Sequence, residues 1–176
     1  MKLLGISGSL RKESVNTKLL RAAAVHFDPG DFEVADLRLP LYDADLEAER
    51  GIPAEVQTLA DNIGLADAVI LSTPEYNQSM SGVIKNALDW VSRVDGNPWE
   101  NKPVAMMSAT GGRSGGGRAN YALRLAMVPF RPLVSPGLEV LVPFARKAFN
   151  EDGSLIDEAI DARLKSSMQT LRSLVG

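Results

Sequence analysis

Short apolar runs alternate along this chain with stretches of helical periodicity. The runs are bounded by Gly, Pro or Asp, and most contain β-branched residues, which favours strands over buried helices. Strands are predicted at residues 2–6, 32–37, 68–72, 104–108 and 138–142, and helices at residues 17–26, 53–65, 81–93, 118–127 and 156–174. Because parallel crossovers are usually helical, this alternation predicts an α/β fold whose parallel sheet is covered by helices on both faces.

Length and charge narrow the class of protein. With 176 residues, of which 45% are hydrophobic, the chain fits a single domain, residues 1–176, with a sizeable core. The formal net charge is -3 and Lys and Arg are scattered singly, so we expect no nucleic-acid partner. No stretch approaches the ~18 apolar residues of a membrane span, and no signal-peptide pattern is found. We therefore expect a cytoplasmic protein that does not contact membranes.

Cysteine is absent, and His26 is the single histidine. The lack of cysteine excludes disulfides, thiolate metal ligands and cysteine nucleophiles. His26 stands just before the breaker "DPGD", so we interpret it as a surface or helix-end residue. A zinc site or a Ser-His dyad would depend on that one side chain, and we expect neither.

Three unusual loops follow predicted strands. They are "SGSLRKESVN" from Ser7, "TPEYNQSMSG" from Thr73 and "ATGGRSGGG" from Ala109. In open α/β sheets, ligands bind beyond the carboxyl ends of the strands. Convergence of three such loops at one sheet edge favours a flat, phosphorylated cofactor there.

The first loop has the chemistry of a phosphate site. It lacks the ending of a P-loop and the third glycine of a dinucleotide fingerprint. It offers backbone N–H groups at a helix N-terminus, and its polar side chains include Ser7, Ser9, Arg11, Ser14, Asn16 and Thr17. Neutral donors with one cation suit a phosphate monoester. A simple helix cap is the alternative, because Ser and Asn are common before helices.

The second and third loops suit a planar ring. Pro74 stiffens the backbone, so nearby amides and carbonyls could read the edge of a heterocycle, with Tyr76 packed beside it. A rigid turn that caps the following helix is the alternative. In the third loop, glycines would allow close approach to a ring and Thr110 supplies a hydroxyl, while mobility is the competing explanation.

Taken together, the motifs resemble those of the NADPH-dependent FMN reductase family, in particular its chromate and quinone reductase branch. The resemblance rests on "GSLRKESVN", "LPLYDADLEAERGIPAEV", "TPEYNQSMSGVIKNALDW" and "NKPVAMMSATGG", and extends from Lys2 to about Glu139. It implies a flavodoxin-like three-layer sandwich with strand order 2-1-3-4-5. It also implies one FMN per subunit, NADPH or NADH as hydride donor, and a homodimer or homotetramer.

The resemblance also assigns residues to the cofactor. The phosphate side receives Ser9, Arg11, Ser14, Asn16 and Thr17. The isoalloxazine side receives Pro74, Glu75, Tyr76, Asn77, Gln78, Thr110, Gly111 and Gly112. "GGRSGGGR" departs from the family pattern, so contacts of Arg113 and Arg118 with substrate or NADPH stay open; the prolines of "MVPFRPLVSPG" leave the oligomeric state open.

The implied chemistry needs no catalytic side chain, because the flavin supplies it. Hydride would pass from NAD(P)H through flavin N5 to quinones, chromate, azo compounds, ferric complexes or free flavin in ping-pong turnover. We expect the Glu75 side chain to point to solvent. The alternatives are a non-catalytic flavodoxin-like electron carrier or redox sensor that holds FMN, and a phosphate-ligand enzyme without flavin.

Overall fold

The computed structural model describes residues 1–176 and contains a parallel sheet and six α-helices. In chain order the elements are β1 (Lys2–Ser7), α1 (Val15–Phe27), β2 (Asp31–Val34), α2 (Ala44–Arg50), α3 (Ala54–Leu65), β3 (Ala68–Thr73), α4 (Gly82–Val91), β4 (Pro103–Ala109), α5 (Gly117–Met127), β5 (Leu133–Val134), β6 (Val140–Val142) and α6 (Glu158–Ser173). The sheet order is β2-β1-β3-β4-β5, and β6 also pairs with β4. The predicted flavodoxin-like order 2-1-3-4-5 is therefore confirmed.

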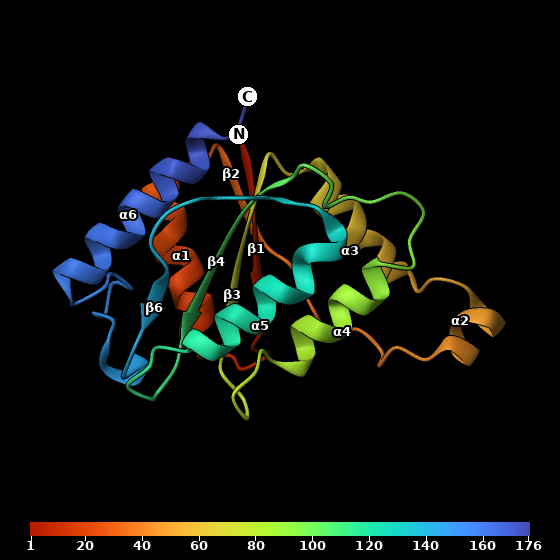
Figure 1. Cartoon of the computed structure of the whole chain (residues 1–176), viewed down its shortest axis with the longest axis horizontal. Helices are drawn as coiled ribbons and strands as arrows, with labels where there is room; N and C mark the ends of the chain where they lie inside the picture. The colour runs from red at the N-terminus through yellow and green to blue at the C-terminus, as the bar shows by residue number, and fades with distance from the viewer.

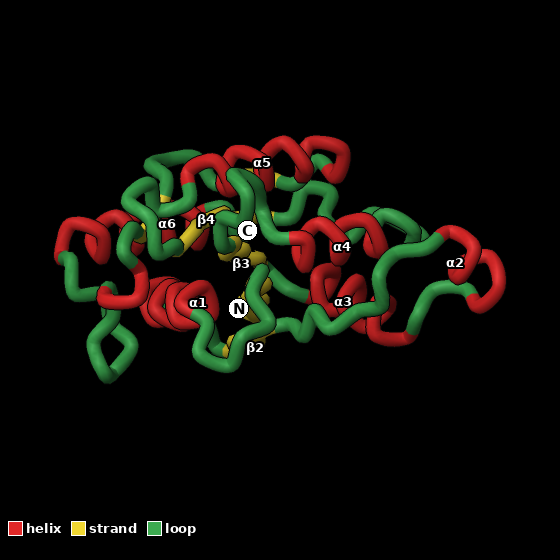
Figure 2. The backbone as a smooth tube through the Cα atoms, turned by 90° about the horizontal axis from the view of Figure 1, so that it is seen from below, coloured by secondary structure: helices red, strands yellow, loops and turns green.

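Helices cover both faces of the sheet, as Figures 1 and 2 show. One apolar core lies between the sheet and α3, α4 and α5, and includes Ile63, Trp90 and Leu123. The other lies between the sheet and α1 and α6, and includes Leu19 and Leu164. The central strand β3 is buried along its whole length, which explains its uninterrupted apolar sequence.

The fifth strand is broken into two pieces, unlike the single strand predicted at residues 138–142. Leu133–Val134 and Val140–Val142 pair with opposite ends of β4, opposite Pro103 and Met107 respectively. Between them lie Pro136, which has no N–H to donate, and Gly137, whose φ is 125°. The chain leaves the sheet there, and Leu138 is 76% exposed.

Helix α2 was not predicted, because none of its residues is buried and it therefore lacks an apolar stripe. Asp43 caps its N-terminus by accepting a hydrogen bond from the Asp45 N–H. Glu47 fastens the helix to the body: Tyr42 Oη donates to it at 3.1 Å, and Arg93 Nε donates at 3.0 Å. Desolvation and the neighbouring Glu47 carboxylate raise the pKa of Tyr42. In Figure 1, α2 projects at the edge of the molecule farthest from α6.

Near its C-terminal end, helix α1 is joined to α6 by His26. Its Nε2 lies 2.8 Å from Asp161 Oδ1, and the His26 side chain is 19% exposed. The single histidine is therefore a helix-end residue that pairs with a carboxylate. No helix in the structure has the length and apolar character needed to cross a bilayer.

Candidate cofactor site at the carboxyl edge of the sheet

The register of the sheet brings the three loops together. Ser7 lies opposite Ser72 in the pairing of β1 with β3, and Thr73 lies opposite Ser108 in the pairing of β3 with β4. Three strands therefore end at nearly the same level. The Gly8 N–H donates to the Ser72 carbonyl at 2.8 Å, and Ser108 Oγ donates to the Thr73 carbonyl at 2.6 Å. The strand ends are locked into one edge by these bonds.

The first loop forms an open groove at the start of α1. Ser14 is the N-cap, and its Oγ accepts from the Thr17 N–H at 3.3 Å. Thr17 Oγ1 in turn donates to Ser7 Oγ at 2.9 Å. A groove of about 330 Å³ is lined by Ser9, Arg11 and Thr17 and closed on its far side by residues 34–38. Both the cap and the phosphate-site interpretations fit, because Ser14 caps the helix while Arg11 is exposed and in no ion pair.

Asn16 has a different place from the one predicted. Its side chain is turned inward, and the residue is 1% exposed. Nδ2 donates to the Ala109 carbonyl at 3.0 Å, while Oδ1 accepts from the Ala109 N–H and from Ser72 Oγ. The hydrogen bonds of this amide therefore connect the start of α1 to the ends of β3 and β4. The assignment of this side chain as a free phosphate donor needs correction, because both of its polar atoms already have protein partners.

The second loop is a tight two-residue hairpin. Tyr76 and Ser79 exchange backbone hydrogen bonds at 3.0 Å in both directions. The residues between them, Asn77 and Gln78, have φ values of 49° and 65°, as a type I′ turn requires. Tyr76 is 51% exposed, so its ring is available beside a ligand. The rigid turn expected as the alternative is thus present, and it presents the tyrosine.

The Glu75 side chain does not point to solvent, contrary to the expectation from sequence. It is 13% exposed, and its Oε2 accepts from the Ala119 N–H at 3.4 Å. Its Oε1 lies 3.9 Å from Arg118 NH1. Ala119 is in the first turn of α5, where a carboxylate is stabilised by the helix dipole. Glu75 therefore joins the second loop to the helix that follows the third.

The glycines of the third loop fall into two groups. A Cβ on Gly111 or Gly112 would meet no atom within 4 Å, so these residues border open space. A Cβ on Gly116 would lie 1.9 Å from Ser108 Oγ, and its φ is 89°. Gly115 is similarly crowded against Leu141. Packing thus requires Gly115 and Gly116, whereas Gly111 and Gly112 leave room for a ligand.

Sequence reasoning missed Phe144. The Phe144 N–H donates to the Gly112 carbonyl at 3.2 Å, and the Ala145 N–H donates to the Thr110 carbonyl at 2.9 Å. These bonds fasten the segment after β6 to the third loop and add a 63% exposed aromatic ring to this edge. Phe144 has a φ of 47°, which no sequence signal would have suggested for a phenylalanine.

Comparison with known proteins decides the family. The family described as NADPH-dependent FMN reductase matches residues 1–147, which hold all three loops. The chain belongs to the NADPH-dependent FMN reductase family. Among relatives of this reductase-family chain, the NAD(P)H-dependent FMN reductase of Pseudomonas aeruginosa is 42% identical over 176 residues, covering 98% of this chain and 94% of the relative.

A second relative and a solved structure also have the names of oxidoreductases. The quinone reductase of Escherichia coli K12 is 42% identical over 132 residues, covering 73% of this chain and 70% of the relative. Among solved structures, FerB from Paracoccus denitrificans, described as a flavoenzyme NAD(P)H:(acceptor) oxidoreductase, has a TM-score of 0.87 and 32% identity. The match covers 99% of this chain and 96% of that one. The family fold is therefore matched over nearly the whole chain.

The residues at the sheet edge fit the FMN that the family name implies. The first backbone N–H groups of α1 have no acceptor within the helix, and unpaired Arg11 lines the groove beside them. At the other end, Gly111 and Gly112 border open space and Tyr76 is exposed. The chain thus offers a positively charged end for the phosphate and an uncrowded stretch of backbone for the ring.

Proposed function

We propose that this reductase-family chain is an FMN-dependent NAD(P)H oxidoreductase that reduces quinones. The observation that carries the proposal is the pairing of the Arg11 groove with the open glycine backbone at Gly111 and Gly112 on one sheet edge. The names of the Pseudomonas aeruginosa and Escherichia coli relatives support the same donor and acceptor classes. Bound FMN would supply the hydride acceptor and donor at its N5 position.

The chain's own residues have binding and positioning roles. Ser9, Arg11 and Thr17, with the start of α1, hold the phosphate by charge-assisted and helix-end hydrogen bonds. The hairpin of Tyr76 to Ser79 and the backbone from Thr110 to Gly112 border the ring and present main-chain dipoles to it. Phe144, whose N–H donates to the Gly112 carbonyl, adds an exposed aromatic ring beside this backbone on the side of β6.

The proposal is tested with purified protein and added FMN. We expect flavin absorption bands that persist after gel filtration, and NADPH oxidation that accelerates when a quinone is added. Parallel lines in double-reciprocal plots would support ping-pong turnover. Chromate, azo dyes, ferric complexes and free flavin are then compared as acceptors at equal concentration. A protein that takes up no FMN contradicts the proposal.

The alternative of an electron carrier or redox sensor is separated by stopped-flow mixing. The proposed oxidoreductase bleaches its bound flavin directly when mixed with NADPH. Bound flavin that NADPH fails to bleach, but that a partner reductase reduces, would instead identify a carrier. The edge does not present the acidic docking surface typical of a shuttle, because its exposed charges include Arg11, Arg113 and Arg146.

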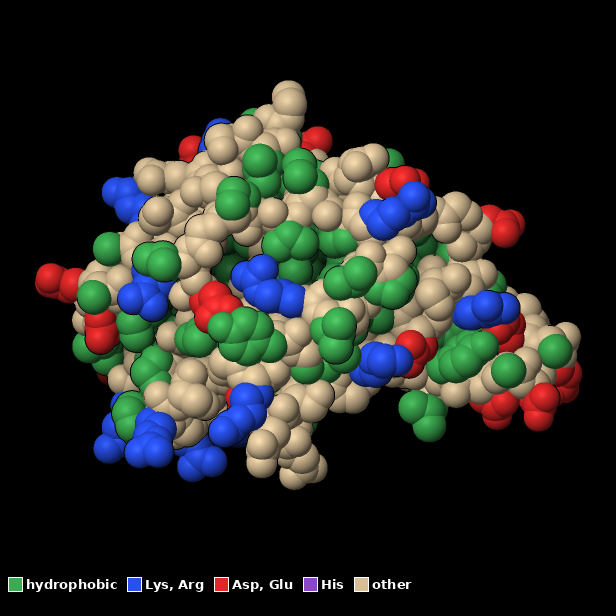
Figure 3. Space-filling view, viewed as in Figure 1, with side chains coloured by type: hydrophobic (Ala, Val, Ile, Leu, Met, Phe, Trp, Pro, Cys, Tyr) green, Lys and Arg blue, Asp and Glu red, His purple; other side chains and the backbone are tan.

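We also propose that the subunits associate as a homodimer or homotetramer. Large apolar side chains lie exposed along α5 and just beyond it: Tyr121 is 63% exposed, Leu125 74% and Val128 67%. Figure 3 shows apolar side chains gathered on this face of the molecule. Contiguous exposed apolar surface is typical of interfaces. Light scattering of the wild type and of Leu125→Glu measures the state, and we expect the variant to have the smaller mass.

A further inference from the structure

A hollow of about 390 Å³ lies between α1 and the turn that precedes α6, and none of its lining residues is assigned to FMN. One wall is the face of α1 that runs from Lys18 to His26. The other wall is formed by residues 152–155, with Asp161 in the first turn of α6. Figures 1 and 2 show α6 beside α1. The family match covers residues 1–147, so the second wall of this α1–α6 hollow lies outside it.

The turn that forms the second wall is held in place by its own hydrogen bonds. The Asn150 N–H donates to the Ser154 carbonyl at 2.9 Å, and the Ile156 N–H donates to the Ala148 carbonyl at 3.0 Å. Leu155 is 7% exposed and belongs to the apolar core between the sheet and α1 and α6. The wall is therefore preformed, and a ligand does not have to order it on binding.

Asp152 presents an ionised carboxylate at this wall. Its Oδ1 accepts from the Ser154 N–H at 2.9 Å and from Ser154 Oγ at 2.7 Å. These hydrogen bonds lower the pKa of Asp152, because they stabilise its charged form. Asp152 is in no ion pair, and its Oδ2 has no hydrogen-bond donor in the chain. One carboxylate oxygen is therefore left for a cationic group of a ligand.

Arg21 is the matching cation on the wall formed by α1. It is exposed and in no ion pair. The other charged groups of the hollow have partners within the chain: Lys18 lies 3.6 Å from Glu13, and His26 lies 2.8 Å from Asp161. Arg21 and Asp152 are thus the two charges of the hollow without counter-ions, and they do not pair with each other.

Apolar surface lines the same hollow. Ala22 and Val25 belong to the α1 wall, and Leu155 belongs to the wall opposite. Val25 is 77% exposed, so a ligand that covers it removes apolar surface from water. The hollow therefore combines one free cation, one free anion and an apolar lining.

We propose that the α1–α6 hollow binds a small zwitterion whose carboxylate and ammonium groups are separated by an apolar chain, as in an ω-amino acid. The Arg21 guanidinium donates to the ligand carboxylate, and Asp152 accepts from the ligand ammonium. The chain between them covers Val25 and Leu155. Each exposed ion pair alone is weak, but a ligand with both groups forms its second pair at a high effective concentration. A requirement for both charges therefore distinguishes this site from simple ion binding.

Calorimetric titration tests the proposal with probes of increasing chain length. The purified protein with added FMN is titrated with β-alanine, γ-aminobutyrate and ε-aminocaproate, and with caproate and hexylamine, which each keep one of the two charges. We expect the tightest ω-amino acid to bind roughly fivefold or more tightly than caproate and hexylamine. It should also raise the thermal midpoint of unfolding, because it binds only the folded chain.

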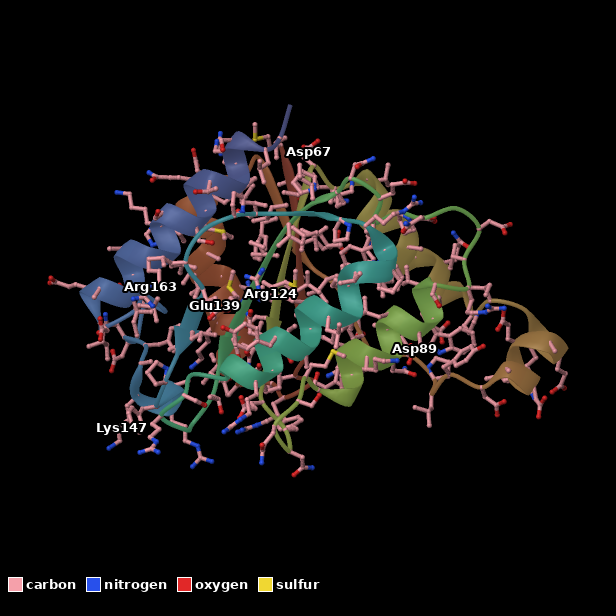
Figure 4. The ribbon with its side chains drawn as sticks, in the orientation of Figure 1. Asp67, Asp89, Arg124, Glu139, Lys147 and Arg163 are labelled. Atoms are coloured by element: carbon pink, nitrogen blue, oxygen red, sulfur yellow. The ribbon has the colours of Figure 1, made fainter.

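Variants remove each charge in turn. Arg21→Ala should bind the tightest ω-amino acid no more tightly than hexylamine, because only the pair with Asp152 is left. Asp152→Asn keeps an acceptor for Ser154 and should bind the same ligand no more tightly than caproate. The matched controls Arg163→Ala and Asp45→Asn remove exposed charges of α6 and α2 outside the hollow, and should keep the wild-type preference. Figure 4 places Arg163 on α6. Melts without ligand confirm that each variant is folded.

Two results would overturn the proposal. One is a wild type that binds the ω-amino acids no more tightly than caproate or hexylamine. The other is a loss of preference in the control variants equal to the loss in the variants of Arg21 and Asp152. The result is independent of the proposed function, because FMN uptake and NADPH oxidation are measured without these ligands. An Arg21→Ala protein that keeps both but loses the preference for the zwitterion would establish the hollow as a second site.

Discussion

Asn16 and Ala109 exchange two hydrogen bonds across 93 positions of sequence. The Asn16 side chain donates to the Ala109 carbonyl at 3.0 Å and accepts from the Ala109 N–H at 3.1 Å, as a neighbouring strand would. The same amide oxygen accepts from Ser72 Oγ at 2.8 Å. One side chain therefore satisfies the end of β4 and sets where α1 begins relative to the ends of the central strands.

Replacement of Asn16 should destabilise the fold. Asn16→Ala leaves the buried N–H and carbonyl of Ala109 and the Ser72 hydroxyl without partners, so we expect the free energy of unfolding to fall by roughly 2–4 kcal/mol. Urea denaturation followed by circular dichroism measures it. Asn62→Ala, on the outer side of α3, is the control and should change stability by less than about 0.5 kcal/mol. A variant that loses FMN affinity at unchanged stability would show instead that Asn16 acts on the ligand.

Substitutions at Gly116 and Gly112 in the third loop should have different effects on stability. Gly116→Ala places a methyl group against Ser108 and requires a left-handed backbone, so we expect a loss of roughly 2–4 kcal/mol in the free energy of unfolding. Gly112→Ala meets no protein atom and should leave stability nearly unchanged. Its methyl group would enter the space assigned to the ring, so FMN affinity should fall. Equal effects of the two substitutions on stability would contradict this division of the glycines.

Arg11 is the expected counter-ion of the FMN phosphate. Arg11→Ala should weaken FMN binding by roughly 1.5–3 kcal/mol, because a hydrogen bond to a charged group is lost. Quenching of flavin fluorescence on titration with the apoprotein gives the dissociation constant. Arg21→Ala, an exposed arginine of α1 away from the groove, should leave it unchanged. If Arg11→Ala bound FMN as tightly as the wild type, the phosphate assignment would be wrong.

Glu75 is expected to stabilise α5 by its charge. Glu75→Gln keeps an acceptor for the Ala119 N–H but removes the charge beside the helix N-terminus and Arg118, so we expect a loss of about 0.3–1 kcal/mol. The chemical denaturation midpoint measures this loss. Glu49→Gln is the control, since Glu49 is exposed on α2 and pairs only with adjacent Arg50. Equal midpoints for the Glu75 and Glu49 variants would rule out the charge effect.

Much of the fold could be predicted from the apolar pattern. The buried run of β3 and the alternation of strands with amphipathic helices give the sheet and its two covering layers. Helix α2 lacks that signal because it buries nothing. The break in the fifth strand reflects Pro136 and Gly137, whose effect on pairing depends on where β4 ends in space.

In the candidate site, too, some features could be predicted from the sequence and others could not. The hydroxyl-rich loop and its arginine could be found because phosphate chemistry follows from residue type. The inward turn of Asn16 could not, because its partners are backbone groups of a strand distant in sequence. The contact of Glu75 with α5 and the left-handed conformation of Phe144 could not be predicted for the same reason, because both depend on tertiary packing.

Gly8 and Ser81 have a consequence for how this sequence can change. A Cβ on Gly8 would lie 2.6 Å from Ser81 Oγ, and that same oxygen accepts from the Ile84 N–H to cap α4. A Cβ on Gly8 would also lie 2.9 Å from Ile84 Cδ1 and 3.0 Å from Pro74 Cδ. A larger residue at position 8 therefore needs a smaller residue at position 81 and a shift of these two neighbours, and the change at position 81 removes a helix cap. The order of substitutions is therefore constrained, and a library that randomises the phosphate loop alone will sample few folded alternatives at position 8.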